Sequence, residues 1–324
     1  MAEKRKLITI VTPTYNESLN VEDCRRAIVE LFEKRLPEYD HEQIFCDNAS
    51  ADDTVAILRK MAAADPRVKV IVNARNFGPF RSTFNGLLAT TGDAVVPLFA
   101  ADLQDPAEVI VEFVRQWEAG HEIVYGIRAN REEGALMRGV RHAYYRTVQR
   151  ITDIHIPPDV AEFQLIDKVV VDALRKFDDY YPYIRGMIAS CGFRSVGVPY
   201  TWKARKKGLS KNRLYDLIDQ AINGLISFSN VPLRLALFFG LILSGLSILY
   251  AIFTAAVNLI FYRKLAPAGI PTLLTALFFF SGVQLFFLGV FGEYISAIQS
   301  QVRKRPLVIE RERINFPDDA KPPA

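Results

Sequence analysis

The sequence has few of the residues that build disulfide frameworks or metal clusters. Only three of its 324 residues are cysteines, Cys24, Cys46 and Cys191, and no Cys-x-x-Cys pair occurs. An odd number of widely spaced cysteines argues against a disulfide framework and against a structural zinc site. Reduced thiols in a cytosolic domain fit this pattern best. The four histidines show no ligand spacing, and we expect them to be structural or exposed: His41, His121, His142 and His155.

The chain also lacks a large excess of charge, and its first residues do not predict a secretory leader. Its formal net charge is only +4, which does not favour a nucleic-acid binder. The charged N-terminus, Met1 to Lys6, leads into an apolar run that is too short for the apolar region of a signal peptide. We therefore predict that this run forms the first buried strand of a folded domain.

Charge is absent from two long stretches near the C-terminus. No charged residue occurs from Leu235 to Tyr262 or from Leu265 to Gly292. Each stretch exceeds the roughly 20 residues that a helix needs to cross a bilayer. Two buried helices of a soluble domain are the alternative. We predict a transmembrane hairpin within residues 232–300, with helices at about 235–262 and 268–292 joined through Arg263 and Lys264.

Basic residues lie outside the hairpin on both sides, which predicts its orientation. They are Lys203, Arg205, Lys206, Lys207, Lys211, Arg213 and Arg234 before it, and Arg303, Lys304, Arg305, Arg311 and Arg313 after it. Because cytoplasmic flanks carry the excess of Lys and Arg, both termini are expected in the cytoplasm. The segment 301–324 is then a cytoplasmic tail, and its polar, proline-rich part from Asn315 is expected to be disordered.

Residues 213–231 show the apolar spacing of an amphipathic helix just before the hairpin. The apolar positions are Leu214, Leu217, Ile218, Ala221, Ile222 and Leu225. This i, i+3, i+4, i+7 pattern places them on one helix face. The face packs either on its own domain or into the membrane surface, and the short distance to the hairpin favours the membrane.

Residues 1–212 alternate between short apolar runs and helical patterns. The expected strands are 7–12, 44–46, 68–72, 94–99 and 122–126, and the expected helices lie near 21–34, 53–64, 80–90 and 106–118. This alternation predicts an α/β domain with a Rossmann-like, mostly parallel sheet. Such sheets bind ligands beyond the carboxyl ends of their strands.

Three polar loops follow the expected strands. They are Pro13–Glu17, Asp47–Thr54 and Ala100–Pro106. Ordinary helix starts explain some of their residues, because Ser50 suits a helix cap and Asp105 precedes Pro106. Capping does not explain Asp47 or Asp102, which directly follow apolar strands. We expect these two carboxylates to belong to a ligand site.

The order of the motifs resembles that of a known family. PTYNE at 13–17, DNASADDT at 47–54, NFGPFRSTFNGLLATTGD at 76–93 and DLQDP at 102–106 resemble the family 2 glycosyltransferases of GT-A fold. GIRANR at 126–131, Phe163-Gln164-Leu165, Arg185-Gly186, GLSK at 208–211, GEYI at 292–295 and RKRP at 303–306 narrow the resemblance to polyprenyl-phosphate glycosyltransferases. That group includes dolichyl-phosphate mannose synthase and the GtrB-like bacterial enzymes.

The resemblance implies a nucleotide-sugar site with a divalent metal. Pro13, Tyr15 and Glu17 would line the base and ribose pocket, and Asp47 would accept a hydrogen bond from the base. Mg²⁺ or Mn²⁺ would bridge the diphosphate to Asp102, with Gln104 beside it, because these ions prefer oxygen ligands.

The chain departs from the family pattern at two places. Ala100 stands where relatives often carry an additional acid of the metal site, so a two-carboxylate site is in doubt. Glu162 stands where an Asp is expected in relatives, and Asp159 shares or replaces its role. The resemblance implies that the catalytic residues are Asp102, Glu162, Asp159 and Arg128.

The acceptor implied by the resemblance is a polyprenyl phosphate. Such a phosphate is largely dianionic at neutral pH, so it needs little help from a general base. Arg128 or Arg131 would stabilise the donor side, and direct attack would invert the anomeric carbon. The implied residues for the acceptor phosphate are Arg131, Arg205, Ser210 and Lys211. The alternatives are a basic patch that contacts anionic lipid headgroups, surface salt bridges for the two arginines and a solvated charge for Glu162.

We therefore expect an enzyme that transfers sugar from a nucleotide-sugar, such as UDP-glucose, to undecaprenyl phosphate. The expected location is the cytoplasmic face of a bacterial inner membrane, in contact with membrane lipids. The expected partners are a downstream flippase, an acceptor transferase and other copies of the chain. A catalytically weakened scaffold that binds nucleotide-sugar and a processive polysaccharide synthase of the same fold are the alternatives.

Overall fold

The computed structural model describes residues 5–130, 160–203, 270–303 and 305–317, together with five isolated positions between 238 and 249. The chain divides into two compact units. The first comprises residues 1–146, 154–214 and 304–324, and the second comprises residues 147–153 and 215–303. The predicted amphipathic helix at 213–231 lies outside the described residues, as does most of the first predicted span.

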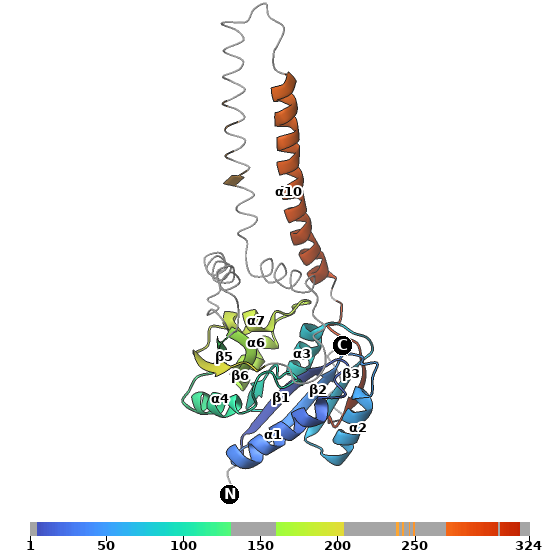
Figure 1. The fold of residues 1–324 in the computed structure, drawn as a ribbon, viewed down its shortest axis with the longest axis vertical. Coiled ribbons are helices and arrows are strands. Elements are labelled where there is room, and N and C mark those ends of the chain that lie inside the picture. The colour runs from blue at the N-terminus through green and yellow to red at the C-terminus, as the bar shows by residue number, and fades with distance from the viewer. Residues whose placement is uncertain are drawn as a thin grey trace, which may run out of the picture. The chain divides into compact units, whose positions relative to one another are not determined.

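The first unit is built on an eight-stranded sheet in the order β7-β5-β6-β4-β1-β2-β3-β8 (Figure 1). The strands are β1 (Leu7–Thr14), β2 (Asp40–Asp47), β3 (Val68–Asn73), β4 (Ala94–Val96), β5 (Ile123–Asn130), β6 (Val160–Asp167), β7 (Ser195–Thr201) and β8 (Glu310–Ile314). The α/β fold predicted from the sequence is confirmed. The five expected strands are all present, whereas β6, β7 and β8 were not expected.

Parallel pairing dominates the sheet, and two strands run against it. β1 pairs in parallel with both β2 and β4, β2 with β3, and β5 with β7. β6 is antiparallel to β4 and β5, and β8 is antiparallel to β3. The first residues of β6 therefore lie at the same edge as the last residues of the parallel strands.

Helices cover both faces of the sheet. They are α1 (Val21–Arg35), α2 (Thr54–Ala64), α3 (Pro79–Leu88), α4 (Val109–Glu118), α6 (Lys168–Leu174) and α7 (Ile184–Ser190). Ile8 and Ile10 of β1 belong to a core cluster that also contains Phe32 of α1 and Phe113 of α4. Because side chains alternate along a strand, Val11 points to the opposite face, where α3 packs. Helix α4 begins three residues later than the sequence predicted.

The contact between α3 and the sheet requires a glycine. A Cβ added to Gly86 would lie 2.2 Å from Cys46 Sγ and 3.0 Å from Val11 Cγ1. Cys46 is 1% exposed and cannot move aside without disturbing the core. The three cysteines are all unpaired, and burial raises the pKa of Cys46 above its ordinary value.

We expect Gly86→Ala to lower the free energy of unfolding by about 1–3 kcal/mol, because the added methyl overpacks the α3 contact. The double variant Gly86→Ala/Cys46→Ala should recover part of this loss, since Cys46 Cβ is 3.9 Å from the added atom. Thermal unfolding of the purified protein measures both values. Additive losses in the double variant would contradict the predicted contact.

The C-terminal segment returns to the first unit as strand β8. Asn315 Nδ2 donates hydrogen bonds to the carbonyls of Ala62 at 2.7 Å and Val68 at 2.8 Å. Glu312 also pairs with Arg59 of α2 at 2.6 Å, so both α2 and β3 hold the C-terminal segment. The expectation of disorder from Asn315 is therefore wrong for this residue, because its amide satisfies two carbonyls of the sheet unit.

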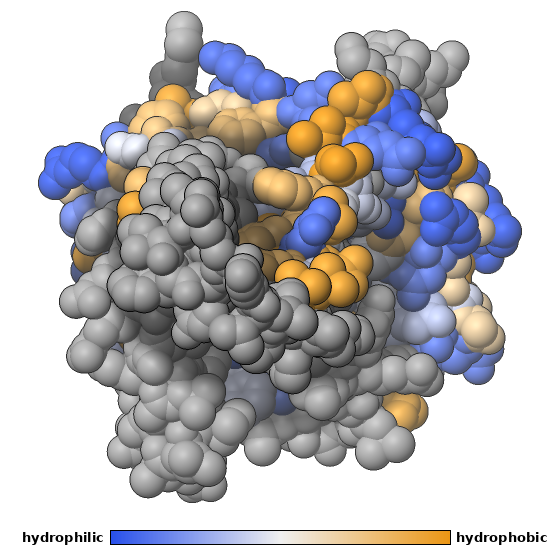
Figure 2. Space-filling view, turned by 90° about the horizontal axis from the view of Figure 1, so that it is seen from above, coloured by the Kyte–Doolittle hydropathy of each residue, from blue (hydrophilic) through white to orange (hydrophobic). Residues whose placement is uncertain are grey.

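The second unit contains helix α10 (Ile270–Val302). It covers residues 270–292 of the second predicted span, 268–292, and continues ten residues beyond that span. Several large apolar side chains on it are exposed, including Leu273 at 70% and Leu285 at 69%. Hydrophobic residues, orange in Figure 2, also reach the described surface beside hydrophilic ones. Within the part of the chain that the structure describes, no helix combines the length and apolarity needed to cross a membrane.

Candidate functional site

Three loops at the carboxyl ends of β1, β2 and β4 carry unusual backbone conformations. Asn16, Ala49 and Leu103 have positive φ angles of 53°, 62° and 56°, one in each loop. This left-handed region is unfavourable for residues other than glycine, and most of all for a bulky residue such as Leu103. Strained residues of this kind concentrate at functional sites, where the surrounding structure holds them. The three strained residues lie in the three loops where the sequence predicts a ligand site, and that site stays a prediction.

Hydrogen bonds join the first loop to the second. The backbone amide of Asn16 donates to Ser50 Oγ at 2.8 Å, and the Asn16 side chain accepts from the amide of Ala51 at 2.7 Å. The amide of Glu17 donates to Thr54 Oγ1 at 2.9 Å. The prediction that Ser50 caps a helix is wrong, because α2 begins at Thr54 with Asp53 before it. Ser50 instead connects the two loops.

Asp47 organises this junction from inside. Its side chain is fully buried, and its oxygens accept from the Ser50 amide at 2.9 Å and from Thr14 Oγ1 at 3.3 Å. Burial raises the pKa of Asp47, and the hydrogen bonds from Ser50 and Thr14 act in the opposite direction. These contacts give Asp47 a role in shaping the loops. Direct contact between Asp47 and a base stays a prediction.

The loop after β3 joins the same network. Asn48 Oδ1 accepts from the Phe77 amide at 2.9 Å, and Asn48 Nδ2 donates to Asn76 Oδ1 at 2.8 Å. Asn73 Nδ2 also donates to Asn48 Oδ1 at 3.2 Å. Sequence reasoning missed this role of the three asparagines, although Asn76 opens a motif that the resemblance had singled out.

The other predicted nucleotide-site residues lie on or beside the first loop. Pro13 is the residue before the last in β1, where it pairs with Cys46 of β2. Tyr15 is 38% exposed and directly follows the last residue of β1. Glu17 accepts a hydrogen bond from Asn20 Nδ2 at 2.5 Å. The structure thus brings Pro13, Tyr15 and Glu17 together with the Asp47 loop.

Asp102 and Gln104 form a compact turn after β4. The backbone amide of Gln104 donates to Asp102 Oδ1 at 3.2 Å, and both side chains are half-buried. Their carboxylate and amide oxygens are ligands that Mg²⁺ and Mn²⁺ accept, with the remaining positions left to phosphate oxygens and water. No group of three or more His, Cys, Asp or Glu side chains suited to a metal occurs among the described residues. The oxygen atoms of Asp102 and Gln104 suit a metal ion that takes one carboxylate ligand from the protein.

A buried cluster beside this turn holds Arg128. Asp105 is only 4% exposed, and its Oδ1 accepts from the Tyr200 hydroxyl and from Arg128 Nη2 at 3.4 Å. Arg128 Nε donates to Tyr200 Oη at 3.1 Å. Arg128 and Tyr200 are register partners on adjacent strands, so their side chains share one face. Despite the burial, Asp105 and Tyr200 keep the pKa of Arg128 above its ordinary value.

Two details of this cluster could not be read from the sequence. The interpretation of Asp105 as a simple helix start is wrong, because Glu108 precedes α4 and Asp105 binds Arg128. Gly126 makes room for Tyr200, since a Cβ at this glycine would lie 2.5 Å from Tyr200 Cε1. The glycine in the 126–131 motif thus has a packing role.

Replacing Tyr200 by Phe should reduce the sugar-transfer activity that the family resemblance implies about tenfold in kcat/KM, which corresponds to ~1.4 kcal/mol. The hydroxyl it removes fixes Arg128 and satisfies the buried Asp105 carboxylate, so the protein should also lose about 1–3 kcal/mol of stability. Tyr39→Phe is the matched control, because its hydroxyl also donates to a carboxylate, Glu118, away from the site. Thermal unfolding and transfer assays should show stability losses in both variants and an activity loss in Tyr200→Phe alone.

Glu162 lies near the start of β6, at the same edge. Its Oε1 is 3.7 Å from Arg185 Nε, and its side chain is 27% exposed. Arg185 Nη1 donates to the Val160 carbonyl at 2.6 Å, which ties the arginine to the first residue of β6. Burial raises the pKa of Glu162, while Arg185 and Arg128 oppose that shift. The structure therefore brings two predicted residues, Glu162 and Arg128, into one electrostatic cluster and adds Arg185.

The pKa of Glu162 is raised in the folded protein. Just above the ordinary Glu pKa of about 4.3, the Glu162 carboxyl is therefore still protonated in the folded protein, whereas it has already lost its proton in the unfolded chain. The contribution of Glu162 to stability should therefore fall as pH rises through this window, so the wild type should lose stability relative to a variant without this carboxyl. Glu162→Gln removes that dependence, whereas the exposed control Glu108→Gln keeps it. Unfolding temperatures across the acidic to neutral range measure the difference. A gain in wild-type stability relative to Glu162→Gln with rising pH would contradict the assignment.

Five predicted residues lie outside the described residues. They are Asp159, Arg131, Arg205, Ser210 and Lys211.

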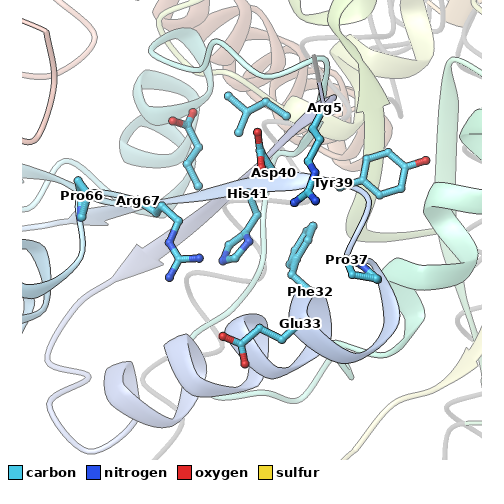
Figure 3. Close-up of a pocket in the computed structure, with 11 residues that line it drawn as sticks. Arg5, Phe32, Glu33, Pro37, Tyr39, Asp40, His41, Pro66 and Arg67 are labelled. Atoms are coloured by element: carbon cyan, nitrogen blue, oxygen red, sulfur yellow. The ribbon is translucent and has the colours of Figure 1, made fainter. Parts of the chain in front are cut away.

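A cavity of about 570 Å³ lies at the opposite edge of the sheet, where β1 and β2 begin (Figure 3). His41 lines it and stacks on Phe32 with ring centroids 4.4 Å apart. His41 and Asp40 point to opposite sides of β2, as alternation along a strand requires. Burial, with Arg25 and Arg67, lowers the pKa of His41 to about 4, so the imidazole is neutral at neutral pH. None of the predicted site residues lines this cavity.

The chain matches two family profiles. Residues 9–175 match the profile described as Glycosyl transferase family 2. Residues 231–298 match the profile described as the GtrB C-terminal hairpin. The first match contains the three polar loops, and the second coincides with the two uncharged stretches.

Curated relatives match this chain over nearly its whole length. The uncharacterized glycosyltransferase YkcC of Bacillus subtilis is 34% identical over 302 residues, 93% of this chain and 92% of the relative. The bactoprenol glucosyl transferase of Shigella phage SfX is 33% identical over 307 residues, 94% of this chain and 99% of that one. A mannosyltransferase from Pyrobaculum calidifontis, solved with GDP-Man and Mn²⁺, shares 18% identity and covers 93% of this chain and 87% of its own, with a TM-score of 0.46.

Proposed function

Because the chain belongs to glycosyl transferase family 2, we propose that it transfers a sugar from a UDP-sugar, such as UDP-glucose, to a polyprenyl phosphate at a membrane. The single observation that carries this proposal is the convergence of the Asp47, Asp102 and Glu162 segments on one edge of the sheet. The similarity to a bactoprenol glucosyl transferase over nearly the whole chain supports the choice of donor and acceptor.

The donor would lie along the edge formed by β2, β1 and β4. The aromatic ring of Tyr15 and the loop that begins at Asp47 suit a base and ribose. The Asp102–Gln104 turn suits a metal-bound diphosphate. Mg²⁺ or Mn²⁺ held there would neutralise charge on the leaving diphosphate. Arg128 adds a fixed positive charge near this turn, because Asp105 and Tyr200 prevent its guanidinium from turning away.

Glu162 and Arg185 would act on the acceptor side. A phosphate monoester is mostly dianionic at neutral pH and attacks without a strong base. Arg185 offers an oxyanion a planar donor group, and Glu162 limits the net positive charge beside it. Attack on the face of the anomeric carbon opposite the diphosphate would invert its configuration. Arg131, Arg205, Ser210 and Lys211 are proposed to contact the acceptor phosphate as well.

The proposed membrane anchor is a helical hairpin in residues 232–300. The match to the GtrB C-terminal hairpin over residues 231–298 supports it, as do the two stretches without charge. Both termini and the sheet unit would then lie on the cytoplasmic side of a bacterial inner membrane, since basic residues flank the hairpin. A flippase, an acceptor transferase and further copies of this chain are the proposed partners.

The proposal is tested with membranes that contain the full chain, Mn²⁺, undecaprenyl phosphate and either UDP-glucose, UDP-galactose or GDP-mannose. We expect one hexosyl lipid, identified by its mass, from a UDP-sugar. Asp102→Asn should reduce its formation about 100-fold, because the proposed metal site loses its charged ligand. Full activity of Asp102→Asn would contradict the assignment of Asp102 as the required metal ligand. Absence of glycolipid with every donor, while nucleotide-sugar still binds, would favour a binding scaffold.

A further inference from the structure

An exposed indole lies beside the proposed diphosphate turn. Trp202 follows strand β7 and is 36% exposed. The other tryptophan of the chain, Trp117, is 8% exposed, and its Nε1 donates to Asp167 at 2.7 Å. Trp117 is therefore part of the core, whereas Trp202 presents a large apolar ring at a polar edge. No motif identified in the sequence includes Trp202.

Two contacts define where this indole lies. The backbone amide of Lys203 donates to the Gln104 carbonyl at 2.9 Å, which joins the chain just after Trp202 to the Asp102–Gln104 turn. The Arg128 guanidinium carbon is 5.4 Å from the centroid of the indole, within the range of a cation–π contact. Trp202 thus shares its arginine with Asp105 and Tyr200, and it borders the site on the β7 side.

The strand order indicates which part of a donor would meet the ring. Along the site edge, the order runs from β2 and β1, through β4 and β6, to β5 and β7. A nucleotide-sugar is a chain of base, ribose, diphosphate and sugar in fixed covalent order. With the base at the Tyr15 and Asp47 loops and the diphosphate at Asp102, the sugar points towards β5 and β7. Trp202 lies at that end.

We propose that Trp202 is the platform on which the donor's sugar ring stacks, an inference that rests on the proposed function. A hexose presents polar edges formed by its hydroxyls and an apolar face formed by its C–H groups. An indole is a large, rigid apolar surface with few rotatable bonds, so it covers such a face at a small entropic cost. The platform recognises the sugar and leaves the base untouched, which makes Trp202 a residue for sugar affinity and sugar choice.

Binding of UDP and of UDP-glucose, each with Mn²⁺, separates the sugar contact from the nucleotide contacts. In calorimetry on the full-length protein, Trp202→Leu should bind UDP-glucose about tenfold more weakly and UDP unchanged. Trp202→Phe keeps an aromatic face and should retain most of the UDP-glucose affinity. This rescue separates stacking from simple filling of space, because Leu is also large and apolar.

Tryptophan fluorescence gives an independent readout on the wild type. UDP-glucose should change the emission of Trp202 clearly more than UDP does, because only the sugar covers the ring. In Trp202→Phe the remaining signal comes from the buried Trp117, and the sugar-dependent change should disappear. The pair UDP and UDP-glucose is its own control for effects of the nucleotide.

Other outcomes overturn the platform. If Trp202→Leu weakens the binding of UDP and of UDP-glucose equally, Trp202 acts by supporting Arg128. If both affinities are unchanged, Trp202 does not belong to the donor site. A rise confined to the KM for undecaprenyl phosphate would assign the indole to the prenyl chain instead. Failure of the wild type to bind UDP-glucose at all would overturn the proposed UDP-glucose donor itself, which is a separate result.

Discussion

Parallel pairing of β1 with β2 and β4 is the constraint on which the rest of the structure depends. The pairing sets the carboxyl ends of the three strands side by side at one edge, so their following loops have to share a small volume. We interpret the positive φ angles at Asn16, Ala49 and Leu103 as a consequence of this crowding, because each loop has to turn sharply there. The hydrogen bonds around Ser50 and Asn48 repay part of that strain.

Strand β6 extends this edge in the opposite direction. Because it is antiparallel to β4 and β5, its first residues rather than its last reach the site. Glu162 therefore meets the same edge as Asp102, although the two residues come from opposite ends of their strands. The parallel pair β5 and β7 adds Arg128, Tyr200 and, just beyond the strand, Trp202. One side of the site is thus assembled by residues after position 120.

Buried hydrogen-bond partners fix the position of the Arg128 guanidinium at this site. Asp105 is nearly inaccessible, and a buried carboxylate needs hydrogen-bond donors on its oxygens. Tyr200 and Arg128 supply them, so the demand of the buried group fixes the direction of the arginine. A mobile surface arginine would lose entropy on binding an anion, whereas one held in this way has lost it on folding. This preorganisation connects packing of the core with the chemistry proposed at the edge.

The sequence by itself determined the α/β class, the five main strands, the first four helices and the polar loops that form the site. These depend on local patterns: apolar runs, helical spacing and turn residues next to one another in the chain. Only the tertiary structure decided the pairing of β6, β7 and β8, because β7 and β8 lie far along the chain from β5 and β3, and β6 inserts between β4 and β5. The tertiary structure also showed that Ser50 connects two loops and that Asp105 binds Arg128, where the sequence predicted helix caps. It further placed Trp202 against Arg128. Local sequence cannot report which distant group a side chain meets, since that depends on strand order.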